Sequence, residues 1–156
     1  MGRTRILAGI VLGLAVSVAA QADAKSIKQS KLPAAVLRSA EEQVAGATVT
    51  GYSTDKVNGV VTYRMDLVSE GKTRGIVIDK EGTVLAVEQE VAWNDLPEDI
   101  QKTFDTVKTK GELGAVSTVH ENGTLVAYVA YLTTKTERNL VRVKPKAADA
   151  AATGTK

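Results

Sequence analysis

Two pairs of residues recur at a constant spacing, and this recurrence constrains the fold more than any other feature. Leu32-Pro33 is followed by Asn58-Gly59, and the same pairs return 64 positions later, at 96–97 and 122–123. Pro is well tolerated in the first turn of a helix, and Asn-Gly is a strong signal for a tight hairpin. We therefore interpret the chain as one supersecondary unit, a helix followed by antiparallel strands, used twice.

The first copy predicts one helix and four strands. The helix opens at Pro33, carries apolar residues at helical spacing through Val44 and ends at Gly46. Four strand-like segments follow, and turn residues separate them at 58–59, 70–71 and 79–82. A helix of this kind covers one face of its strands. The expected fold class is therefore α+β, with a helix packed on a four-stranded antiparallel meander.

The second copy predicts the same unit in shortened form. Its helix runs from Pro97 to Lys108, and strands follow near 113–120, 124–133 and 138–143, with no clear fourth strand. The segment from Leu125 to Leu132 is apolar at nearly every position. Such a segment is either a central strand covered on both faces or part of a contact surface.

The N-terminus has the features of a secretory signal peptide. Arg3 and Arg5 precede an apolar run over 6–20, and small-x-small patterns end at Ala22 and Ala24. We expect cleavage after Ala24, with Ala22 as the second choice, and a protein of the bacterial periplasm or the medium without membrane insertion after cleavage. The expected organisation is a signal peptide (1–24), a flexible lead-in (25–31), the first unit (32–94), the shortened second unit (95–144) and a disordered tail (145–156).

Composition argues against most chemistries. The chain has no Cys, one His, 20 basic and 18 acidic residues. The lack of Cys excludes disulfides, thiol catalysis, thiolate metal sites and a lipid anchor on Cys, and the balanced charge argues against a nucleic-acid partner. The single His120 precedes a hairpin turn, where a polar residue is expected in any case, and alone it makes a catalytic triad or a zinc site improbable. We therefore predict no enzyme, no catalytic or metal-binding residue and no cofactor.

Two aromatic residues are the candidate contacts with a partner. Trp93 is the only Trp and lies at the junction between the two copies. It is either a buried plug between the units or an exposed anchor for a partner, because Trp is both largely buried on average and enriched in binding hot spots. Tyr128 is the second candidate, because it lies in the strand that is apolar on both faces.

Several of these motifs resemble the PepSY and PepSY-like domains of exported bacterial proteins, including the tandem β-lactamase-inhibitor-like group. The resemblance rests on the Leu-Pro helix start, the Asn-Gly hairpin, Tyr63-x-Met65-x-Leu67 and the hairpin that begins at Asp79, and it spans 32–143. It implies a non-catalytic role in binding a protein or peptide, often as an inhibitor or regulator of another envelope or secreted protein. The alternative is a structural envelope protein that associates with itself through open sheet edges.

Overall fold

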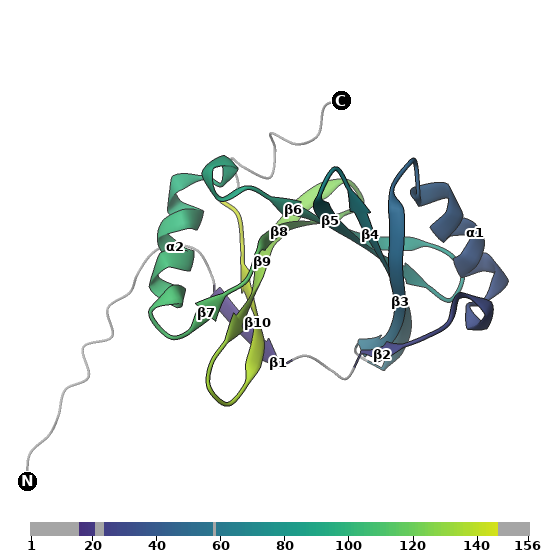
Figure 1. Cartoon of the computed structure of the whole chain (residues 1–156), viewed down its shortest axis with the longest axis horizontal. Coiled ribbons are helices and arrows are strands. Elements are labelled where there is room, and N and C mark those ends of the chain that lie inside the picture. Colours follow the sequence, from purple (N-terminus) through teal and green to yellow (C-terminus); the bar gives the residue numbers. More distant parts are fainter. Residues whose placement is uncertain (1–15, 21–23, 58, 147–156) are drawn as a thin grey trace, which may run out of the picture.

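The computed structural model describes residues 16–20, 24–57 and 59–146 (Figure 1). It contains the short 3-10 helices η1 (Gln29–Lys31) and η2 (Trp93–Asp95) and the α-helices α1 (Ala34–Gln43) and α2 (Glu98–Lys108). The strands are β1 (Val16–Ala20), β2 (Lys25–Ser26), β3 (Thr48–Val57), β4 (Val60–Ser69), β5 (Lys72–Asp79), β6 (Val84–Val91), β7 (Glu112–Leu113), β8 (Val116–Glu121), β9 (Thr124–Thr133) and β10 (Arg138–Val143).

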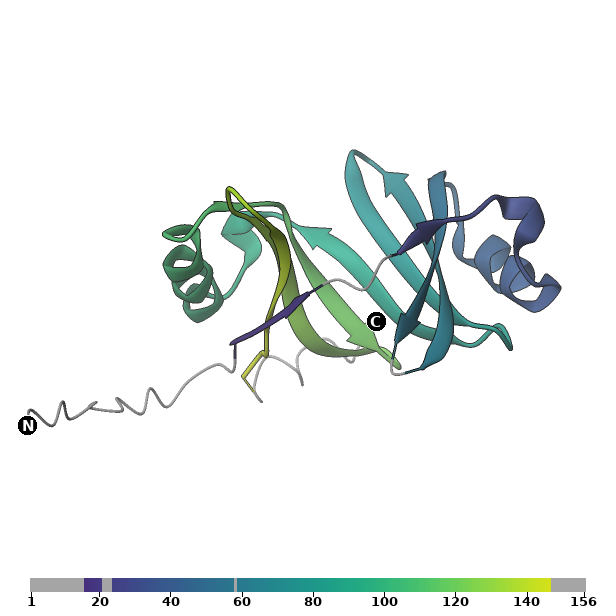
Figure 2. The same ribbon diagram turned by 90° about the horizontal axis from the view of Figure 1, so that it is seen from below.

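All ten strands belong to one antiparallel sheet. Its order is β1-β10-β9-β8-β6-β5-β4-β3-β2, and β7 pairs with β9 beside β8. The sheet curls into a half-barrel, and α1 and α2 both lie outside the curve, near its opposite ends (Figures 1 and 2). In the part of the chain that the structure describes, no helix has the length and apolar character needed to cross a membrane.

The expected fold class, a helix packed on a separate four-stranded meander and then repeated, is wrong. The strands of the two copies form one continuous curled sheet, and strands rather than helices dominate the structure. The junction is the pairing of β6 with β8, from Val87 opposite His120 to Val91 opposite Val116. Two separate meanders would each leave the backbone N–H and C=O groups of an edge strand unpaired, and this ladder satisfies them.

Each helix covers its own part of the outer face. Val36 and Ala40 of α1 pack on Met65 and Ile76, and neither helix residue is more than 1% exposed. The second core cluster is larger and forms beneath α2. It contains Ile100, Phe104 and Val107 from the helix and Tyr128, Ala130, Leu132, Val141 and Val143 from β9 and β10. A fully buried side chain of this size contributes about 1.5–3 kcal/mol to stability.

Several local predictions are confirmed. The second helix ends at Lys108 as expected and buries the predicted stripe of Ile100, Phe104 and Val107. β9 lies between β8 and β10 and is buried on both faces, which settles its role as a central strand. Asn122 and Gly123 both have positive φ, as the Asn-Gly hairpin requires.

The elements of the two copies coincide at the predicted spacing of 64. η1 and η2, the first residues of α1 and α2, and the bounds of β4 and β9 all differ by this number. The predicted lead-in contains β2, in which Lys25 pairs with Thr54 and Ser26 with Ser53. Of the predicted tail, only Pro145 and Lys146 are among the described residues.

The turn between β5 and β6 depends on Gly82. This residue has φ +92°, and a Cβ at this position would lie 2.8 Å from the backbone oxygen of Ala35 in α1. The turn is closed by the N–H of Thr83, which donates to the Asp79 carboxylate at 2.8 Å. Gly82 is therefore needed both for its backbone conformation and for the close approach of the turn to the helix.

We predict that Gly82→Ala lowers the free energy of unfolding by about 1–3 kcal/mol, because it combines a strained φ with a steric conflict. The matched control is Gly71→Ala, since Gly71 has φ +76° and open space around its missing Cβ. Urea unfolding monitored by circular dichroism should show a smaller loss for the control. Equal losses would mean that the contact with α1 contributes nothing.

Candidate functional site

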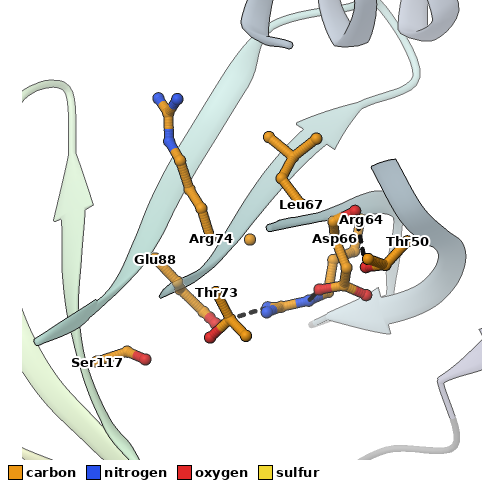
Figure 3. A pocket seen from close by; sticks show the side chains of 9 residues that line it. Thr50, Arg64, Asp66, Leu67, Thr73, Arg74, Glu88 and Ser117 are labelled. Atoms are coloured by element: carbon orange, nitrogen blue, oxygen red, sulfur yellow. Dashed lines mark hydrogen bonds and ion pairs between the residues drawn. The ribbon is translucent and has the colours of Figure 1, made fainter. Parts of the chain in front are cut away.

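The concave face of the sheet carries a cavity of about 350 Å³. Figure 3 shows that Arg64, Asp66 and Glu88 extend on one side of the sheet, whereas Leu67 and Arg74 point toward the side that carries a helix. Successive side chains of a strand alternate between the two faces, so the burial of Met65 and Leu67 beneath α1 turns Arg64 and Asp66 to the concave side. The lining consists of Thr50, Arg64, Asp66, Leu67, Thr73, Arg74, Gly75, Glu88 and Ser117.

Arg64 joins two carboxylates across the floor of this cavity. Its Nε donates to Oδ1 of Asp66 at 2.7 Å, and its Nη1 donates to Oε2 of Glu88 at 2.7 Å. Asp66 lies on the same strand, whereas Glu88 lies on β6, with β5 in between. The three side chains are between 26% and 44% exposed, so water reaches them and the pairs are only moderately stabilising. Their main effect is to fix a pattern of charge on the concave face.

Gly75 makes this bridge possible. It lies opposite Asp66 on one side and opposite Glu88 on the other, so it occupies the middle of the row that Arg64 must cross. A Cβ on Gly75 would lie 2.6 Å from Cζ of Arg64. The guanidinium therefore rests directly on the backbone of β5, and any larger residue would displace it. A lone Gly inside a strand is a known sign of such close approach.

The charges of Arg64, Asp66 and Glu88 shift the pKa values of groups on the concave face. Burial alone would lower the pKa of Arg64, but the carboxylates of Glu88 and Asp66 outweigh it and hold that pKa above its ordinary value. The pKa of the half-buried Tyr131 on β9 is also raised, first by burial and then by the negative charge of Glu88. Tyr131 additionally stacks with Arg138, whose Cζ lies 4.0 Å from the ring centroid. The cluster and this aromatic residue thus share one electrostatic environment.

A second acidic group is fixed at the rim. Glu90 accepts two hydrogen bonds at Oε2, from the backbone N–H of Thr73 at 3.1 Å and from its hydroxyl at 2.8 Å. These bonds, the backbone one first, hold the pKa of Glu90 below its ordinary value. Glu90 is two residues from Glu88 on β6, so both carboxylates belong to the same face.

Apolar residues continue the concave face beyond the charged cluster. Val119, Ala127 and Val129 form a core cluster of their own, with exposures of 3%, 0% and 5%. Val119 lies opposite Glu88 in the pairing of β6 with β8. The concave face therefore carries the charged cluster beside a small, buried apolar cluster that holds β8 and β9 together on this side of the sheet.

The structure separates the two predicted contact residues from this cavity. Trp93 lies in η2, half-buried against the cluster beneath α2, and Nζ of Lys108 lies 3.3 Å from its ring centroid. Tyr128 is 5% exposed and packs in the same cluster, so it is a core residue rather than a surface contact. Ala24 is exposed, and Ala22 lies outside the described residues.

Sequence reasoning missed the residues that line the cavity. It named only Trp93 and Tyr128 as candidate contacts and gave no role to the residues of β4, β5 and β6 that line the cavity. The isolated Gly within a strand was the one available signal. Within the described ranges, no three His, Asp or Glu side chains gather closely enough to hold a metal ion.

Comparison of the chain with protein-family models, with curated proteins and with solved structures gave no match.

We predict that Gly75→Ala displaces the Arg64 guanidinium and breaks its contact with Glu88 while the fold is retained, because the displaced atoms are the end of a long side chain. The crystal structure of the variant would show this directly. Its free energy of unfolding should fall by about 1 kcal/mol, and Arg64→Met should give a similar loss. An unchanged Arg64 position in Gly75→Ala would contradict the prediction.

We also predict that Thr73→Val raises the pKa of Glu90 toward its ordinary value, because one of the two bonds to the carboxylate is lost. A lowered carboxyl pKa adds stability at pH values above the unfolded-state pKa of about 4.3, and this stability is lost as pH falls through the folded-state pKa. The variant should therefore lose less stability on acidification. Carboxyl NMR titration measures the change, with Glu98 on α2 as the internal control. Its pKa is lowered by Lys102 and should not move.

Proposed function

We propose that this protein is an exported, non-catalytic binding protein that holds a segment of another protein or a peptide against the concave face of its sheet. The observation that carries the proposal is the placement of both helices outside the curve (Figure 1). The inner face is left with a cavity of about 350 Å³ whose floor carries a fixed ion cluster. Concave surfaces that combine apolar area with a few fixed polar groups are the usual form of binding sites.

The chemistry of the cavity favours binding over catalysis. The two carboxylates nearest its floor, Asp66 and Glu88, are both engaged by Arg64. His120, the only His in the chain, is not among the residues that line the cavity. A fixed pattern of opposite charges recognises a complementary partner and contributes to specificity.

Export is supported by the leader-like features of residues 1–24. The resemblance to PepSY-like domains agrees with a binding role outside the cytoplasm. We propose that this binding inhibits another envelope or secreted protein.

A second candidate function is self-association as a structural envelope protein. The observation in its favour is the other end of the sheet, where the two-residue strand β2 pairs with Ser53 and Thr54 of the ten-residue strand β3 and the N–H of Ile27 donates to the backbone oxygen of Tyr52. The rest of this edge has no partner strand among the described residues, so it can pair with another strand.

The test replaces Ser117 in the cavity with the photo-crosslinking residue benzoylphenylalanine in the full chain, expressed in the cell that produces the protein. Irradiation should give a discrete adduct, and its mass and peptide map identify the partner. Glu42, an exposed residue of α1, is the matched control position and should give none. An adduct at twice the mass of the chain would favour self-association instead.

Displacement of Arg64 provides the second control. Gly75→Ala in the same background should reduce the adduct about fivefold, because a charge-assisted contact contributes on the order of 1 kcal/mol to binding. The absence of any adduct at Ser117, or equal adducts at Ser117 and Glu42, would refute the proposed concave site.

A further inference from the structure

Among the described strands, the one that covers the outer edge of β10 belongs to the expected leader. β1 pairs with β10 antiparallel over five residues, from Val16 opposite Val143 to Ala20 opposite Asn139. The other edge of β10 pairs with β9. In a chain that has lost residues 1–24, β10 becomes the last strand of the sheet, with one row of unpaired backbone groups.

The first unit shows what kind of strand this edge accepts. There β6 pairs with β5 in the position that β1 takes beside β10. Val87 of β6 lies opposite the buried Ile76 and packs against the cluster beneath α1. By register, Val18 of β1 takes the equivalent position opposite Val141, which is 0% exposed. We therefore expect this edge to prefer β-branched apolar residues at the two positions opposite Val141 and Val143.

The intervening positions are Arg138, Leu140 and Arg142, so two of the three carry positive charge, and Arg142 forms an ion pair with Glu121 at 3.5 Å. Arg138 and Arg142 alternate with Asn139 and Val141, so they share the face of β10 that is turned away from α2. A second copy of β10 would bring the same arginines to this edge, and like charges on neighbouring strands repel. A partner strand with acidic residues between its apolar ones complements the edge instead. The strand β6 has acidic residues at alternate positions, Glu88 and Glu90, with Val87 and Val91 at the two sides of the pair and Gln89 between them.

We propose that the outer edge of β10 binds an extended segment of a partner protein by β-strand addition. The segment has β-branched apolar residues opposite Val141 and Val143 and acidic residues on the face that carries Arg138 and Arg142. Backbone pairing supplies affinity in this mode, and the alternate side chains supply specificity. The inference rests on the proposed export, because the leader must vacate the edge. It adds a second surface, since no residue of β10 lines the concave cavity.

The test uses the full chain with the edge opened by Ser17→Pro and Val18→Pro. Adjacent N–H groups of a strand point to opposite sides, so one of the two prolines removes a donor that faces β10. The probe is a fluorescent peptide with the sequence of β6, VLAVEQEV, measured by anisotropy. It should bind the double variant at least about tenfold more tightly than the wild-type full chain. Hydrogen exchange should show new protection within residues 138–143.

Charge exchange tests the specificity. Arg138→Glu in the opened chain should weaken binding of VLAVEQEV about threefold and strengthen binding of VLAVKQKV. Arg38→Glu on the exposed side of α1 changes the net charge equally and should alter neither. Should the prolines prevent folding, Val16→Lys with Val18→Lys opens the edge by placing charges opposite buried valines.

Three results would overturn the inference. The peptide could bind the opened and wild-type chains equally, or the new protection could lie outside β10. The opened chain could also form a dimer without peptide, which would make a second copy the occupant. None of these results depends on crosslinking at Ser117, so failure here and failure of the concave site are distinguishable.

Discussion

The pairing of β6 with β8 is the interaction on which the rest of the structure depends. It joins the strands of two similar units into one sheet, and no other strand pair within the described residues bridges them. Because each pair of neighbouring strands adds twist in the same sense, a sheet of this length curls when it is continuous. The curl places both helices outside and leaves an inner face uncovered by helices, so the concave site is a consequence of the fusion (Figure 2).

The ion cluster shows how the inner face differs from the outer one. On the outer face, apolar side chains from two layers exclude water and provide most of the stability. On the inner face, Arg64 spans β5 only because Gly75 has no side chain, and it holds two carboxylates that water still reaches. Such partly exposed ion pairs contribute little to the free energy of unfolding. Their main effect is to hold the three charges in fixed positions on the inner face.

Local structure could be predicted from the sequence, and the assembly of the sheet could not. The spacing of apolar residues and Pro97 were sufficient to predict α2, and Asn122-Gly123 was sufficient to predict the hairpin between β8 and β9. Both signals act within a few residues. The pattern of apolar and polar residues in β6 is the same whether its outer edge faces water or pairs with β8. The residues of β6 alone therefore could not predict that the sheet continues into the second unit. The cavity was missed for the same reason, since Arg64 and Glu88 are 24 residues apart and meet only across β5.

The two units differ in completeness, and this difference explains where binding surfaces arise. In the first unit, β6 completes the sheet beneath α1, and its Glu88 lines the cavity. In the second, the chain supplies three strands and the equivalent fourth position beside β10 is held by β1. The core beneath α2 nevertheless extends to Val141 and Val143 at this edge, both fully buried. Val141 and Val143 are buried next to a strand edge whose backbone groups need a partner strand. Removal of β1 would leave this edge unpaired and would therefore favour the addition of another strand.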